Sequence, residues 1–194
     1  TFDILEETPE RLCEVKGLAK KHIDNIIDAW DEHRNNVNAI MFLTNHGLSM
    51  GISQKIIKRY SNQTIKIINE DPYRLAMEVR GVGFKTADQM ASSLGIPKDS
   101  LQRIKACIVH LLKQAEDKGH CYLPNDELCS EVIALLEKDM GVLISKLVDA
   151  IQELNDSGQV VTEQKIDHIN EKISYHFTRD LYEAEINVAE CITS

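Results

Sequence analysis

The chain has 194 residues, 43% of them hydrophobic, and a net charge of −9, which fits one or two globular domains of ordinary soluble composition. No apolar run approaches the roughly 18 residues of a membrane span, and no signal peptide opens the chain. The five cysteines form no C-x-x-C pair, which argues against a zinc cluster and for free thiols in a reducing cytoplasm. Because the chain begins at Thr1, we expect a segment of a longer protein.

Helices separated by short glycine-containing turns are predicted over the first half of the chain. Apolar residues recur there at i, i+3, i+4 and i+7, the spacing of an amphipathic helix. Capping residues and prolines mark where the helices begin. We expect helices to start at Pro9, near Ile23, near Val37, after Ser49, at Asp71-Pro72 and at Lys85 or Thr86.

Three helices and a β-hairpin are predicted over the second half, in the order typical of a winged helix. We expect the helices at about 100–118, from 124 onward and at about 143–154, strands at 159–162 and 173–177, and a last helix over 178–190.

The predicted fold is therefore mainly α, with tandem helix-hairpin-helix units followed by a winged-helix-like α+β segment with a small β-hairpin. Pro97 and the polar residues after it mark the expected boundary. We predict a tandem helix-hairpin-helix domain over 1–98 and a winged-helix-like domain with a C-terminal helix over 99–194.

The pattern of helix, glycine turn and helix occurs three times in the first half. The turns lie at 16–19, 45–49 and 80–85. Their regular spacing of about 30 residues indicates repeated two-helix units that stack on a shared core.

The third turn carries the strongest indication of function. Gly81 and Gly83 permit unusual backbone angles and leave room for a close neighbour, while Val82 is expected to point inward. The backbone N–H groups of the turn and the N-terminus of the next helix then form an anion site. A DNA phosphate fits such a site without any reading of base identity. Phe84, Lys85 and Thr86 complete this candidate site.

The other two turns are weaker candidates for phosphate binding. Gly17 is followed by Leu and Ala, with Lys20 nearby, whereas Gly47 is followed by Leu48 and Ser49, with Lys55 farther along the helix. Either turn can hold a phosphate, and either can equally be a packing unit that never touches DNA.

The acidic net charge is unevenly distributed. Residues 1–100 carry 13 Lys and Arg against 14 Asp and Glu, whereas residues 101–194 carry 9 against 17. The window 33–69 contains five basic residues and no acid. A local positive face can still bind phosphate, because salt confines its field to roughly 8–10 Å. The alternative is that these bases are only a solvated helix face.

No catalytic or nucleotide-binding motif is evident. The stretch from Gly81 to Thr86 superficially resembles a phosphate-binding loop, but a P-loop requires Gly-Lys after a strand, and the chain has no Gly-Lys dipeptide. Glu183, Glu185 and Glu190 are expected to form a solvated face. We therefore expect no catalytic residue, metal site or cofactor within these residues. The predicted third helix of the second half offers one base, Lys146, so that half is expected to be a scaffold or protein contact surface.

Five blocks of the sequence resemble the helix-hairpin-helix region of RecD-like helicases, also labelled the alpha subunit of exodeoxyribonuclease V. That family shows them as NPYRL, GIGFKTAD, LGI, RI-A and GH-YLP. The first glycine turn departs from its usual G-x-G, and the Asn-Pro step is widened by two acids. Here the blocks are NEDPYRL at 69–75, VGFKTAD at 82–88, LGI at 94–96, RIKA at 103–106 and GHCYLP at 119–124.

The resemblance implies a parent protein that unwinds duplex DNA from a single-stranded 5′ end in DNA recombination and repair. Its ATP and Mg²⁺ would bind in motor domains outside this chain. The implied partners are DNA, as a single strand or a single-strand/duplex junction, and the protein's own motor domains. Two alternatives stay open: a spacer that positions the motor or a protein partner without touching DNA, and a stand-alone junction-binding repair protein.

Overall fold

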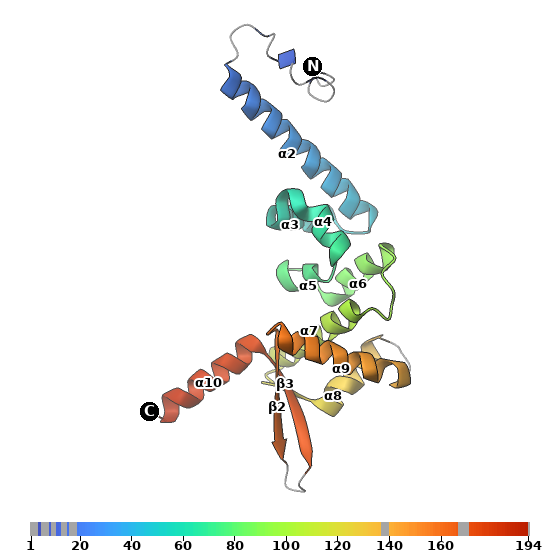
Figure 1. Ribbon diagram of the computed structural model, residues 1–194, viewed down its shortest axis with the longest axis vertical. Coiled ribbons are helices and arrows are strands. Elements are labelled where there is room, and N and C mark those ends of the chain that lie inside the picture. The colour runs from blue at the N-terminus through green and yellow to red at the C-terminus, as the bar shows by residue number, and fades with distance from the viewer. Residues whose placement is uncertain are drawn as a thin grey trace. The chain divides into compact units, whose positions relative to one another are not determined.

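The computed structural model describes residues 19–136, 140–166 and 171–193, together with positions 4, 8, 11, 12 and 15 (Figure 1). The predicted helix at Pro9 and the turn at Gly17 lie outside the described residues. The chain divides into two compact units, Thr1–Val82 and Gly83–Ser194. The predicted domain boundary at residue 98 stays a prediction.

The first unit is dominated by one long helix, α2, over Lys20–Asn45 (Figure 1). The expectation of two separate helices, near Ile23 and near Val37, is wrong. No glycine or proline occurs between residues 20 and 45, so nothing in the backbone chemistry interrupts the helix. The apolar positions Ile23, Ala39 and Leu43 are buried along it.

Three shorter helices complete the first unit: α3 over Met50–Tyr60, α4 over Thr64–Glu70 and α5 over Arg74–Glu78. The sequence pattern did not predict α4, which follows α3 after a single 3₁₀ turn, η2, at Ser61–Gln63. Apolar side chains from these helices and their connections form the core. The largest completely buried ones are Leu43, Ile56, Ile68, Tyr73 and Leu75.

The second unit is built around α7, over Leu101–Asp117. Its buried face contacts α6 at Phe84–Ser93, α8 at Asn125–Leu136, α9 at Met140–Asp156 and the small sheet. Eight residues of α7 are buried, which makes it the centre of this core: Ile104, Ala106, Cys107, Ile108, Val109, Leu111, Leu112 and Ala115.

A three-stranded antiparallel sheet and helix α10, over Arg179–Thr193, follow the helices. The strands are β1 at Leu123–Pro124, β2 at Val160–Ile166 and β3 at Lys172–Thr178, in the order β1-β3-β2. Thr162 on β2 pairs in register with His176 on β3. The predicted mainly helical fold with a small hairpin is confirmed. That the second half is a winged helix remains a prediction. Among the described residues, no helix combines the length and apolarity that crossing a bilayer requires.

Candidate nucleic-acid interface

Two of the predicted glycine turns lie in described parts of the chain, and they share several local features. Gly47 and Gly81 adopt φ values of 88° and 95°, in the left-handed region that glycine tolerates best. The next residues, Leu48 and Val82, are buried to 5% and 4% exposure. Both turns therefore point an apolar side chain into a core, as predicted for Val82.

The correspondence continues into the helix that follows each turn. Ser49 and Gly83 are the N-cap residues of α3 and α6, with similar extended backbone angles. Four positions later, Ser53 and Ala87 are both fully buried. This local similarity supports the predicted repeat of two-helix units.

The first of these two turns satisfies part of its own polar groups, although the amides of Ser49 and Gly51 have no acceptor among the described residues. The amide of Leu48 donates to the Leu43 carbonyl at 3.1 Å, and the amide of Gly47 donates to the Thr44 carbonyl at 3.0 Å. This pattern closes a helix C-terminus. Beyond the turn, the hydroxyl of Ser49 accepts a long hydrogen bond of 3.4 Å from the amide of Ile52. A protein oxygen therefore lies over the N-terminus of α3.

The second turn differs in two respects: the amide of its positive-φ glycine has no acceptor, and no side chain caps the helix that follows. The amide of Val82 donates to the Val79 carbonyl at 3.1 Å; the expectation that all amides of this turn face outward is wrong at that residue. The amides of Gly81, Gly83 and Lys85 have no hydrogen-bond acceptor in the part of the chain that the structure describes. No side chain caps α6, so its positive end is open to an external anion.

Gly83 is not required by the fold. Its φ of −92° is one that any residue adopts, and a Cβ placed there would meet no atom within 4 Å. Gly81 differs, because its positive φ strains any side chain. Intramolecular geometry therefore explains Gly81, whereas no contact among the described residues requires a glycine at position 83.

Helix α6 is held in the second unit by two contacts. The ring of Phe84 is buried and stacks on His110, with ring centroids 5.4 Å apart. The guanidinium of Arg103, on α7, donates to both carboxylate oxygens of Asp88 at 2.7 and 2.8 Å. A bidentate pair of this kind fixes geometry as well as charge. It therefore anchors α6, whose N-cap is Gly83, to α7.

Unpaired positive charge gathers near the second turn. The ammonium of Lys55, on α3, lies 3.5 Å from the position that a Cβ on Gly81 would take. Arg80 and Lys85 flank the turn in sequence and are exposed. None of the three is in an ion pair with another described residue. Lys55 follows the first turn in sequence, but its charge lies at the second.

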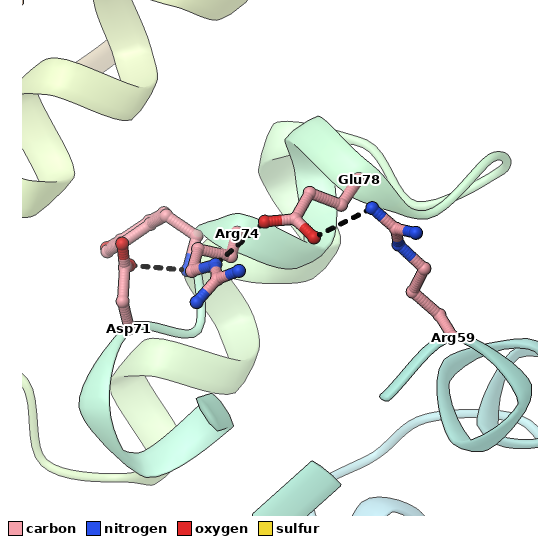
Figure 2. Close-up of polar contacts among 5 residues, drawn as sticks. Arg59, Asp71, Arg74 and Glu78 are labelled. Atoms are coloured by element: carbon pink, nitrogen blue, oxygen red, sulfur yellow. Dashed lines mark hydrogen bonds and ion pairs between the residues drawn. The ribbon is translucent and has the colours of Figure 1, made fainter. Parts of the chain in front are cut away.

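Two other bases of the first unit are neutralised, as Figure 2 shows. The carboxylate of Glu78 accepts from Arg74 at 2.7 Å and from Arg59 at 3.4 Å. Burial raises the pKa of Glu78, but the hydrogen bond from Arg74 and the charges of Arg74 and Arg59 outweigh it and lower the pKa below its ordinary value. Arg59 and Arg74 are therefore less available to an external anion than Lys55.

Sequence reasoning missed several of these relations. Lys20 was a candidate beside the first predicted turn; it is exposed at the start of α2 and belongs to neither described turn. The pairing of Asp88 with Arg103 was not predicted, although each lies in a block shared with the RecD-like family. No sequence pattern indicated that Lys55 would lie close to Gly81.

Comparison with known proteins gives the same assignment as these features. Residues 32–122 match the family model described as the ATP-dependent RecD2 DNA helicase HHH domain. The chain is 27% identical over 124 residues to the ATP-dependent RecD2 DNA helicase of Deinococcus radiodurans. That alignment covers 63% of this chain and 17% of the relative, so the chain spans well under a third of that protein's length. Residues 32–122 are therefore similar to the helix-hairpin-helix domain of RecD2 helicases.

Proposed function

We propose that this chain is the sequence-independent DNA-binding segment of an ATP-dependent RecD-like helicase that moves 5′ to 3′ in DNA recombination and repair. The observation that carries the proposal is the open N-terminus of α6 at Gly83, where amides without acceptors among the described residues occur beside unpaired positive charge. The matched helicase domain supports the same assignment.

A phosphate oxygen at this turn accepts hydrogen bonds from the amides of Gly83 and Lys85. The positive end of the α6 dipole adds a favourable field. The ammonium of Lys85 supplies a full charge, and the hydroxyl of Thr86, which is partly exposed, supplies a further donor. Lys55 supplies a second full charge beside Gly81, within the first unit. All of these groups address the sugar-phosphate backbone, so binding does not depend on base sequence.

The segment then acts as a DNA-binding element that supports the motor domains. It holds a single strand or a single-strand/duplex junction while motor domains elsewhere in the parent protein bind ATP and Mg²⁺. Because the contacts are to phosphates, they are made and broken without regard to sequence as the strand advances.

Fluorescence anisotropy with a labelled single-strand/duplex junction, titrated at several salt concentrations, tests the proposal. We expect log K to fall linearly with log salt, because binding to phosphate releases condensed counterions. Gly83→Val should weaken binding by about tenfold, since a branched side chain over the helix end displaces the phosphate at a cost of about 1.4 kcal/mol. Circular dichroism should show that the helices persist.

Gly51→Ala is the matched control for this variant. Gly51 also lies in the first turn of a hairpin helix, and a Cβ there would meet no atom within 4 Å. Its replacement should leave DNA affinity unchanged. If Gly83→Val also leaves affinity unchanged, or if the chain shows no salt-dependent binding, the proposal is wrong and a spacer or protein-docking role takes its place.

A further inference from the structure

The second unit contains a cavity of about 430 Å³ between α9 and the sheet. Its α9 side combines the apolar side chains of Val148 and Ile151 with the amides of Gln152 and Asn155. The lining as a whole is rich in uncharged hydrogen-bonding side chains. They are Asn125, Gln152, Asn155, Thr162, Gln164, Ser174 and His176.

Four of these side chains form a chain of hydrogen bonds in which each donates to the next. The amide nitrogen of Asn155 donates to the hydroxyl of Thr162 at 2.9 Å. That hydroxyl can then donate its own hydrogen to Nδ1 of His176, 3.0 Å away. Nε2 of His176 consequently carries the ring proton and donates to Oδ1 of Asn125 at 3.2 Å.

The two ends of this chain leave unused groups in the cavity lining. The amide nitrogen of Asn155 also donates to the Ile151 carbonyl, so its hydrogens are used and its oxygen remains an acceptor. The oxygen of Asn125 is used, and its amide nitrogen remains a donor. Neither group has a partner among the described residues, and the same holds for Gln164 and Ser174.

Among the described residues that line the cavity, His176 is the one ionisable side chain, and it is uncharged at neutral pH. Burial lowers the pKa of His176 to about 4, so the ring is neutral and keeps the single proton that the hydrogen-bonded chain requires. A ligand for this cavity is therefore uncharged and presents a donor beside an acceptor.

We infer that this cavity binds one nucleobase of an unpaired DNA strand, with its face against Val148 and Ile151 and its edge at the free amide groups of Asn125 and Asn155. A base has flat apolar faces and an uncharged edge that alternates donors and acceptors, which matches the two kinds of side chain in the lining. A peptide amide carries the same polar groups but lacks the apolar faces. The choice of a base rests on the proposed role in DNA binding.

The acidic charge of this half favours contact with the base over contact with its phosphate. Asp149 and Asp156 lie on α9 outside the cavity lining, whereas Glu153 on the same helix is paired with Lys105 at 2.8 Å. Asp149 and Asp156 repel the backbone, so occupancy of the cavity should not weaken as salt is added. Salt therefore separates this site from the turn at Gly83, where added salt weakens binding.

NMR titration of the full chain with thymidine and with deoxycytidine tests the inference, because both nucleosides lack phosphate. We expect saturable shifts of the His176 ring and of the side-chain amides of Asn125 and Asn155, unchanged by added salt. Thr162→Val interrupts the hydrogen-bonded chain and should weaken nucleoside binding about three- to tenfold, the effect of one hydrogen bond. Gln164→Ala, at an exposed lining position, should weaken it with little effect on folding.

Glu163→Gln is the matched control, because Glu163 lies on the same strand and accepts a hydrogen bond from Tyr182 outside the cavity. It should leave nucleoside affinity unchanged. Absence of shifts with either nucleoside overturns the inference. Equal shifts with N-acetylasparagine methylamide would also overturn it and assign the cavity to a peptide amide. Nucleosides cannot use the phosphate site, so loss of junction binding in Gly83→Val tests the proposed function separately.

Discussion

The two described glycine turns share a positive-φ glycine and a buried apolar residue after it, but they differ at the N-cap of the next helix. At Gly47, the following N-cap is Ser49, whose own oxygen lies over the start of α3. At Gly81, the following N-cap is Gly83, which leaves the start of α6 uncovered. A single side chain at the N-cap therefore distinguishes a helix end with an internal acceptor from one without.

The difference also shows how one hairpin can assist another. Lys55 belongs to the helix that follows the first turn, yet its ammonium lies beside Gly81 in the second. In the proposed function, Lys55 would add charge beside Gly81, a position that the order of the turns along the sequence does not indicate.

Removing the ion pair that anchors α6 to α7 should have the largest effect, a loss of stability. Arg103→Ala removes a bidentate partner of Asp88 whose side chain is only 11% exposed, and should lower the free energy of unfolding by about 2–3 kcal/mol. Urea denaturation followed by circular dichroism measures it. Arg59→Ala, which breaks the exposed contact of α3 to Glu78, should cost under about 1 kcal/mol. Equal losses in the two variants would contradict the special anchoring of α6.

Replacing the glycines one at a time should separate their structural and binding roles. Gly81→Ala and Gly47→Ala should each lower the free energy of unfolding by about 1–2 kcal/mol, because both residues have positive φ. Gly83→Ala should cost at most about 1 kcal/mol, the difference between N-cap residues, and should weaken junction binding. Thermal melts and anisotropy give the two readouts. A large loss of stability in Gly83→Ala would mean that the fold itself requires this glycine.

Removing the charge shared by the two hairpins should have a moderate effect on binding. Lys55→Ala should reduce the slope of log K against log salt by about 1, the value for one lost phosphate contact. Its affinity for the junction should fall several-fold for every DNA sequence tested. Lys66→Ala is the control, since Lys66 is exposed on α4 and lies 4.0 Å from Glu70. If the two variants have the same salt slope, Lys55 is a solvated base and not a phosphate contact.

The smallest expected effect is a gain of binding at the first turn. Ser49→Gly removes the oxygen that covers α3 and costs only a few tenths of a kcal/mol as an N-cap change. An anion at the uncovered helix end should gain about 0.3–1 kcal/mol, which raises junction affinity roughly two- to fivefold in the same anisotropy assay. No gain would show that Ser49 is not what distinguishes the two turns.

The sequence pattern predicted most of the helices and the hairpin, because capping residues and apolar spacing act locally. Ser49 caps α3, as expected, and Ser100 caps α7 at the residue where that helix was expected to begin. Gly95, just after α6, has a positive φ. The pattern failed at α2, where weakly apolar stretches masked one continuous helix, and at α4, which follows α3 without a strong break. Both failures concern where helices join, which packing decides more than propensity does.

The sequence alone determined that this chain contains glycine hairpins of the RecD-like type and that its charge is divided between a balanced first half and an acidic second half. Both facts depend on the order of residues along the chain. Only the tertiary structure decided which turn is open and where Lys55 places its charge. It also brought Asn125, Asn155, Thr162 and His176 into one hydrogen-bonded chain. Those relations join residues far apart in sequence, and packing sets their distances.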